Sequence, residues 1–455
     1  MPPPPATGRI EAIARPAPGI PVLSERFIER LPWRGVKWTV VYVGFLGYLF
    51  AITTYRFPIG NVSMAIALFG LLLQSEKFRM PGILKGLGIF LLWCIAGYPQ
   101  SAYPGLVSTR LELVIKLWFV ALVAANALRT RAQIRFVIFF WLGCFALYPV
   151  RGAIFNFYLY RESVAGRASW NYIFENPNDL AAYCVLMLSL AYGFLSVERK
   201  GPVRLATIAG LAVVPFLVIM TQSRGGFLGF AVFVLAVVAT HRKRGKAILA
   251  AGLIGVLVLA VAPDDVLNRV RNLEGVSSST LKEADKEGSA YQRYEIWKVA
   301  RAIIADHPIA GVGLGAYPAA HYRYSRRPQF DPTAFGMRDT HSTYLNLAAE
   351  TGFVGLGIYL LSYVLTMLRI NRLRKRAASV LPATSQMLYV YLVGALGFFV
   401  CCIFGSMAHV SFLLLHLIVT WAIAEVVEKE LGEIRQGKLV VAPPEPTARA
   451  ARAVR

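Results

Sequence analysis

Three side chains have the chemistry to bind a phosphorylated ligand and to take a proton from a hydroxyl group beside it. His341 opens the stretch "HSTYLNLAAETGFVG", Arg224 lies in "QSRGG" and Arg293 lies in "YQRYEIW". Histidine, with an unperturbed pKa of about 6.5, can take a proton from a hydroxyl group near neutral pH. Arginine binds phosphate oxygens in pairs and stays charged near lipid. Together these residue types predict a site for an anionic ligand with a general base beside it.

Arg224 stands in a very short turn between two apolar segments. A cation there is costly unless it reaches water, an acidic partner or an anionic ligand. The following Gly225 and Gly226 would let a phosphate approach the free N–H groups of a helix start. A structural salt bridge is the alternative, and we favour a functional role because charge embedded in a membrane is usually functional.

Arg293 shares an apolar helical stripe with Ile296, Ala300 and Ile304. A surface helix would place its arginine opposite that stripe, so we expect Arg293 to point into a site between this helix and the rest of the protein. The helix should end before Pro308. The following "GVGLGAY" lacks the Lys and Ser/Thr of a phosphate-binding P-loop, which argues against a nucleotide site.

His341 precedes an apolar run, and helical spacing places Tyr344, Leu345 and Gly352 on its face. Glu350 would lie nearly opposite, so we expect it to bond to another helix or to Arg224 rather than to His341. A helix-terminal polar residue with no task is the alternative for a lone histidine. The separate arginines favour a catalytic role.

Arg151, Arg161 and Arg167 are interleaved with aromatic residues between 150 and 178. They could bind phosphates while the rings stack on sugars, or they could form an interfacial aromatic belt with arginines that reach to the surface. In "NPND" (176–179), we expect Asn178 and Asp179 to cap a helix beginning at Leu180 rather than to act in catalysis.

No metal site or cofactor is expected, because the polar stretches hold no DxD pair, no HExxH and no His/Asp cluster of ligand spacing. The five cysteines all lie in apolar blocks and are expected to pack rather than to form disulfides. They are Cys94, Cys144, Cys184, Cys401 and Cys402.

The elements that position these residues are apolar blocks. The 455-residue chain is 56% hydrophobic with a mean hydropathy of +0.53, and a bilayer core needs about 20 apolar residues per helix. Twelve blocks of suitable length predict an all-α integral membrane protein with about 12 transmembrane helices. Their centres lie near residues 46, 67, 91, 117, 142, 188, 212, 233, 254, 355, 396 and 418.

Basic residues alternate along the connections between the blocks, as in "HRKRGK" (241–246) and "RINRLRKR" (369–376). Positive charge in short loops marks the cytoplasmic side, so both termini are expected in the cytoplasm and the two longer loops outside. This pattern also accounts for most of the net charge of +23 through topology and anionic lipids, without nucleic acid.

The expected organisation has five parts, and the leader and the tail are expected to be disordered. The five parts are a cytoplasmic leader at 1–35; helices one to nine at 36–262, with the outer loop 150–178; a partly helical periplasmic loop domain at 263–340, with a helix near 290–306; helices ten to twelve at 341–430; and a cytoplasmic tail at 431–455.

In combination, "QSRGG", "YQRYEIW", "HPIAGVGLGAY", "HSTYLNLAAETGFVG" and "NPNDLA" resemble the O-antigen ligase family of Gram-negative bacteria, WaaL, and the wider O-antigen ligase/polymerase superfamily. The motifs span roughly residues 150 to 360. One departure is Ser342, where the family often has asparagine.

The resemblance implies an enzyme of lipopolysaccharide biosynthesis in the bacterial inner membrane, with a periplasmic active site and a glycosyltransferase-C-like fold. The implied reaction is a metal-independent, inverting glycosyl transfer from an undecaprenyl-pyrophosphate-linked glycan to a sugar hydroxyl of lipid A–core. His341 would act on the acceptor hydroxyl, while Arg224 and Arg293 would hold the pyrophosphate. Substrate contacts would come from Arg151, Arg161, Arg167, Tyr291 and Tyr344.

Two alternatives stay open. An O-antigen polymerase or a protein O-oligosaccharyltransferase of the same superfamily would share the donor and differ in the acceptor. A transporter of lipid-linked sugars belongs to another class, and it would usually show internal repeats and charges near the membrane midplane.

Overall fold

The computed structural model describes residues 20–442 except 26–30, 56, 199–200, 241–244, 246–251 and 253–288. The expected leader and tail, the apolar block near 254, the start of the second outer loop and the basic stretch "HRKRGK" therefore lie wholly or partly outside the described residues.

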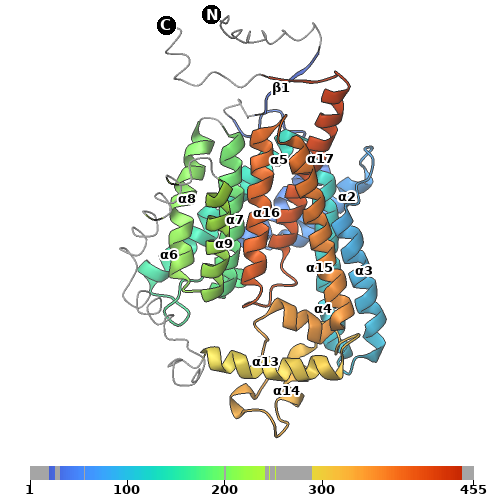
Figure 1. Cartoon of the computed structure of the whole chain (residues 1–455), viewed down its shortest axis with the longest axis vertical. Coiled ribbons are helices and arrows are strands. Elements are labelled where there is room, and N and C mark those ends of the chain that lie inside the picture. The colour runs from blue at the N-terminus through green and yellow to red at the C-terminus, as the bar shows by residue number, and fades with distance from the viewer. Residues whose placement is uncertain are drawn as a thin grey trace, which may run out of the picture.

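The described chain is mostly helical (Figure 1). Its main helices are α1 Val40–Thr54, α2 Gly60–Leu72, α3 Gly82–Gly97, α4 Pro104–Ala127, α5 Arg131–Phe145, α6 Arg151–Phe155, α7 Pro177–Val197, α8 Pro202–Met220, α9 Arg224–Thr240, α13 Ser289–Asp306, α14 Tyr317–Tyr324, α15 Thr343–Ala377, α16 Pro382–Cys401 and α17 Ser411–Arg435. The short strands β1 (Val22–Leu23) and β2 (Val440–Val441) pair in parallel.

Within the described ranges, seven helices are long and apolar enough to cross a membrane, which fits an all-α integral membrane protein. They span Gly82–Gln100, Arg131–Tyr160, Pro177–Val197, Pro202–Met220, Thr343–Ala377, Pro382–Cys401 and Ser411–Arg435. Three shorter apolar helices are α1, α2 and α9, and α4 coincides with a further expected block. The count of twelve stays a prediction because the block near 254 is not described.

Small residues let the central helices approach closely. A Cβ on Gly394 of α16 would lie 2.1 Å from the Ser189 side chain of α7, and a Cβ on Gly229 of α9 would lie 2.5 Å from the carbonyl oxygen of Gly397. Close backbone approach of this kind drives helix association where hydrophobic burial adds little.

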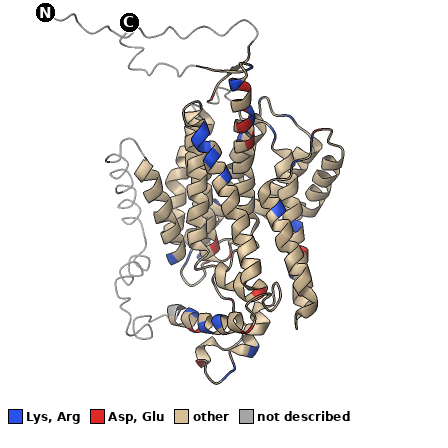
Figure 2. Cartoon of the chain, turned by 45° about the vertical axis from the view of Figure 1, so that its right-hand side comes forward, with Lys and Arg blue, Asp and Glu red and all other residues tan. Residues whose placement is uncertain are grey.

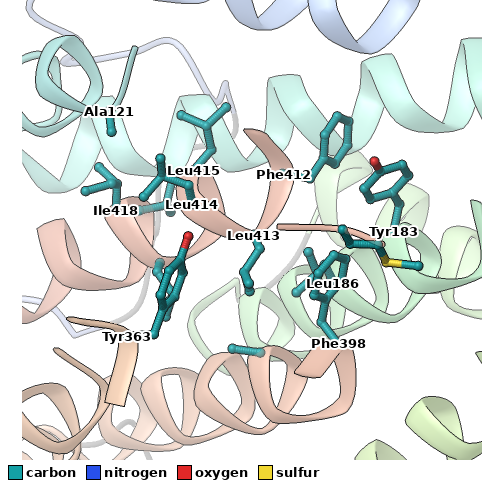
Figure 3. Packing of buried hydrophobic residues seen from close by; sticks show 14 of the residues in the cluster. Ala121, Tyr183, Leu186, Tyr363, Phe398, Phe412, Leu413, Leu414, Leu415 and Ile418 are labelled. Carbon is teal, nitrogen blue, oxygen red and sulfur yellow. The ribbon is translucent and has the colours of Figure 1, made fainter. Parts of the chain in front are cut away.

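Aromatic side chains fill the core between α7, α16 and α17 (Figure 3). The ring of Tyr183 stacks 6.2 Å from that of Phe398 and lies 4.6 Å from that of Phe412. This core gives the functional groups at the helix ends a fixed support.

The two ends of the bundle differ. The β1–β2 pair lies at one end, and α13 and α14 lie at the other (Figure 1). Lysines and arginines gather towards both ends, and fewer lie in the middle (Figure 2). Near the β1–β2 end, Arg135 forms a buried ion pair with Glu198, and Arg131 pairs with Glu430. Some of the charge expected to mark topology is thus also used in helix contacts.

Candidate active site

Helix α13 lies across the segment that carries His341. Its apolar stripe is buried at Ile296, Ala300 and Ile304, and the helix ends at Asp306, before Pro308, as the sequence predicts. The indole Nε1–H of Trp297 donates a hydrogen bond of 2.8 Å to the carbonyl of Thr340. This contact places the end of α13 that bears Arg293 next to the residues preceding α15.

His341 does not belong to the helix that follows it. Its backbone has φ 49°, Ser342 occupies the N-cap position, and α15 begins at Thr343. The expected helical face shared by His341, Tyr344 and Gly352 is therefore wrong. Left-handed backbone at a non-glycine residue is uncommon and gathers at functional sites.

Asp339 lies beside His341. Its Oδ2 lies 3.6 Å from His341 Nδ1, and its Oδ1 accepts a 2.8 Å hydrogen bond from the hydroxyl of Ser406. Asp179, at the start of α7, also interacts electrostatically with Asp339. Two carboxylates thus approach the histidine side of the site.

Burial lowers the pKa of His341 below its usual value, the positive charge of Arg293 lowers it further, and Asp339 partly offsets both effects by raising it. The imidazole is therefore neutral near pH 7 and can accept a proton. Arg293 is close enough to act electrostatically on His341, and its role in binding a substrate stays a prediction.

Arg224 reaches the same end of the bundle through the loop 402–410. Thr343 donates its hydroxyl to the carbonyl of Gly405 at 2.7 Å, and a Cβ on Gly225 would lie 3.0 Å from the Cβ of Phe404. The Arg224 side chain is exposed and has neither an ion pair nor a hydrogen bond to the described part of the chain. That favours a role in binding a ligand over the structural salt bridge.

The glycines after Arg224 do not leave the helix start open. Gly225 and Gly226 are buried, a Cβ on Gly226 would lie 2.5 Å from that of Ala181, and the Gly226 N–H is bonded to the hydroxyl of Ser223. These glycines allow α9 to pack against α7, and the Gly226 N–H is already bonded, so the approach of a phosphate to the backbone here stays a prediction without support from these contacts.

The "HPIAGVGLGAY" stretch packs against a break in α15. Gly352 has φ 67° and ψ −179°, and a Cβ there would lie 1.9 Å from the carbonyl oxygen of Ile309. The Val312 and Gly313 N–H groups donate to the carbonyls of Ala349 and Glu350, both at 2.9 Å. The glycine-rich motif therefore holds a kink rather than binding a nucleotide.

Glu350 is buried and accepts hydrogen bonds from the backbone N–H of Tyr317 and the side chain of Asn346, both at 3.3 Å. Its expected partner was another helix or Arg224. The expected bond to another helix is confirmed, because Tyr317 is the first residue of α14, and no described bond joins Glu350 to Arg224. Asn346 adds a contact within the helix of Glu350 itself, so Glu350 supports the kink from within.

Arg167 ties its loop to two helices. It donates to the Thr221 carbonyl at 2.8 Å and to the Asn178 side chain at 2.7 Å. Asn176, rather than Asn178 or Asp179, caps α7, which begins at Pro177, three residues before the expected start. These contacts give Arg167 a structural task.

Arg151 and Arg161 are exposed. Arg151 lies within α6, and its guanidinium is 4.9 Å from the ring centre of Phe155. The helical segment continues through residue 160, so the outer loop is shorter than the expected 150–178. Arg161 ends that helix with φ 56°. Neither is brought to His341 by a described contact.

The two candidate tyrosines make protein contacts. Tyr291 donates its hydroxyl to Asp331 at 2.9 Å, and Tyr344 donates to the carbonyl of Phe399 at 2.7 Å. The Tyr344 contact fixes α15 to α16.

Sequence reasoning assigned no role to Asp339, although it stands two residues from His341, and it missed Arg110. Arg110 of α4 lies against the "HPIAGVGLGAY" stretch (307–317), which we call the glycine-rich strap. A Cβ on Gly315 would lie 2.7 Å from the Cβ of Arg110. Burial, and secondly Arg110, lowers the pKa of His409 to about 3. The available signal was a charged residue in a largely apolar helix, although Glu112 and Lys116 in the same helix share it.

No group of three or more His, Cys, Asp or Glu within the described ranges could hold a metal ion. The expected metal independence stays a prediction.

Comparison with known proteins agrees with this arrangement. Residues 208–360 match the model of a family described as O-antigen ligase, and no curated protein matches the chain. The matched segment contains Arg224, Arg293, Asp339, His341 and the glycine-rich strap. The resemblance to the O-antigen ligase superfamily is thereby confirmed, and the chain contains the domain of that superfamily over residues 208–360.

Proposed function

We propose that the protein is an O-antigen ligase, transferring a glycan from an undecaprenyl-pyrophosphate carrier to a sugar hydroxyl of lipid A–core. One observation carries the proposal: His341 lies 3.6 Å from the carboxylate of Asp339 and close enough to Arg293 to feel its charge, in the segment that matches the family. A base beside cationic groups is what the transfer of a sugar from a diphosphate requires.

In the proposed reaction, the acceptor hydroxyl attacks the anomeric carbon opposite the pyrophosphate. Because Nδ1 of His341 faces Asp339, Nε2 is the nitrogen left to take the hydroxyl proton. A new C–O bond forms as the bond from the anomeric carbon to the phosphate oxygen breaks, and the bonding electrons leave with the pyrophosphate. Arg293 and Arg224 stabilise the charge that develops on it.

The proposed setting is the bacterial inner membrane. The seven apolar helices and the separation of the β1–β2 end from α13 support it (Figure 1). Both termini would face the cytoplasm, and His341 would face the periplasm beside the lipid-linked donor.

A polymerase or a protein O-oligosaccharyltransferase of the same superfamily would use the same donor groups and differ in acceptor. A transporter would need no general base, so the His341–Asp339 pair favours an enzyme over it.

The test is a transfer assay with purified protein, undecaprenyl-pyrophosphate glycan and lipid A–core, with EDTA present. Wild type should modify lipid A–core, and His341→Ala should lower the rate by about 10²- to 10⁴-fold, the usual contribution of a general base, while still binding the donor. His307→Ala, an exposed histidine outside the proposed chemistry, is the matched control.

Extension of the donor's own glycan would assign a polymerase instead. Full activity of His341→Ala would remove the histidine from the mechanism, and loss of wild-type transfer in EDTA would contradict metal independence.

A further inference from the structure

A polar pocket of about 430 Å³ opens in the loop that follows residue 160, and its described lining includes none of the groups assigned to transfer. Its size is within the range of small-ligand sites. The described side chains around it include an indole, a phenol, amides, hydroxyls and two carboxylates. Those used below are Asn156, Glu162, Trp170, Asn171, Tyr172 and Glu175.

This combination suits a saccharide. Aromatic rings offer apolar faces on which a sugar ring can stack, and amides and carboxylates match hydroxyl groups with donors and acceptors. None of the described lining residues is basic, and neither Glu162 nor Glu175 forms an ion pair with a described residue. A phosphate or uronate in the pocket would meet two uncompensated negative charges, whereas a neutral or amino sugar would not.

The aromatic groups of the pocket are held in place. A Cβ on Gly152 would lie 2.1 Å from Trp170 Nε1, so only glycine leaves room for the indole. The ring of Tyr172 stacks on Tyr55 with 4.7 Å between centres and 16° between planes. Tyr172 nevertheless stays 64% exposed, so a ligand can still reach it.

The loop backbone is strained and anchored. The Gln222 side chain donates to the carbonyl of Gly166 at 2.9 Å, and Arg167 bonds to Thr221 and Asn178. Non-glycine residues with positive φ in the described chain are Tyr55, Arg161, Ala165, Tyr172, Gln222 and His341. All except His341 lie in this loop or contact it, and strained backbone of this kind gathers at ligand sites.

We propose that this pocket is a saccharide subsite that accepts an uncharged or amino sugar of the glycan substrate and rejects one bearing a carboxylate or phosphate. The assignment to the glycan rests on the proposed function, but sugar binding itself does not. The subsite gives the loop a different task from the phosphate binding expected of its arginines.

Binding is measured by saturation-transfer NMR on the full chain in nanodiscs, with three trisaccharides: neutral maltotriose, cationic triglucosamine and anionic trigalacturonate. Wild type should bind the first two and bind trigalacturonate about tenfold more weakly. Trp170→Ala should weaken maltotriose binding about tenfold, as loss of a buried aromatic anchor does. Glu162→Gln with Glu175→Gln, at exposed positions that should not affect folding, should reduce the discrimination against trigalacturonate.

Arg323→Ala is the matched control. Arg323 and Arg327 line a separate pocket of about 400 Å³, where an anionic sugar could bind independently, so this variant should leave maltotriose binding unchanged. Equal binding of all three sugars by wild type, binding of none, or wild-type discrimination in the double glutamine variant would overturn the proposal.

His341→Ala should bind maltotriose like wild type although its transfer rate falls. If wild type binds maltotriose but transfers no glycan, the saccharide subsite is supported and the proposed function is rejected. If wild type transfers glycan but binds none of the sugars, the proposed function is supported and the subsite is rejected. In the transfer assay, a raised KM of Trp170→Ala for the donor would assign the subsite to the donor glycan, and a raised KM for lipid A–core would assign it to the acceptor.

Discussion

Replacing Asp339 with asparagine tests how the protein prepares His341. The substitution keeps the shape of the side chain and an oxygen that can accept the Ser406 hydrogen bond, but it removes the negative charge 3.6 Å from His341 Nδ1. When His341 takes a proton in the transition state, that charge stabilises the imidazolium that forms.

The magnitude follows from Coulomb's law. Two unit charges at this separation interact by about 1 kcal/mol in water and by about 5 kcal/mol at an effective dielectric constant of about 20. The His341 and Asp339 side chains are 37% and 43% exposed, so solvent screens the pair and the lower part of the range applies. A loss of about 1–2 kcal/mol lowers kcat/KM roughly five- to thirtyfold.

The pH profile gives a second, independent readout. Activity requires neutral His341, so it falls as the pH drops through the pKa of that residue. Asp339 raises this pKa and Arg293 lowers it. Asp339→Asn should therefore move the acid limb of kcat/KM to lower pH, and Arg293→Gln should move it to higher pH.

The assay is the metal-free transfer reaction followed from pH 4.5 to 8. Asp306→Asn is the matched control, since Asp306 pairs with Arg327 away from His341, and its acid limb should stay in place. An unchanged rate and an unchanged acid limb in Asp339→Asn would refute the idea that this carboxylate acts through His341.

Two further substitutions test the support of the site and the donor contact. In Gly352→Ala, the new Cβ would lie 1.9 Å from the carbonyl oxygen of Ile309, at a backbone φ of 67°. The substitution should therefore lower the free energy of unfolding by about 1–3 kcal/mol and reduce the Tm. A Cβ on Gly357 in the same helix meets nothing within 4 Å, so Gly357→Ala should leave the Tm unchanged. An unchanged Tm in Gly352→Ala would show that the backbone around Ile309 can move aside. Arg224→Lys should weaken donor binding roughly tenfold because lysine cannot make the paired contact. Arg372 is an exposed arginine near the C-terminal end of α15, and Arg372→Lys should leave donor binding unchanged. Equal donor affinity in Arg224→Lys and wild type would place the pyrophosphate elsewhere.

Local sequence was enough to predict the features that depend on neighbouring residues. The spacing of Ile296, Ala300 and Ile304 predicts the buried face of α13, and Pro308 predicts where that helix ends. The apolar blocks coincide with the described membrane-length helices, because the bilayer imposes both length and composition on each segment separately. Residue chemistry likewise singled out His341, Arg224 and Arg293.

Tertiary structure decided the features that depend on residues far apart in the chain. Asp339 is held by Ser406, 67 positions later, and Glu350 is bonded by Tyr317 rather than by Arg224. Arg167 anchors its loop to two helices, and Gly226 makes room for the side chain of Ala181. The type of a residue shows which contacts it can make, but the fold decides which partner lies next to it. The amino-acid sequence alone therefore determined the helices and the chemical candidates, whereas close packing of distant segments decided which candidates meet at His341 and which hold the site in shape.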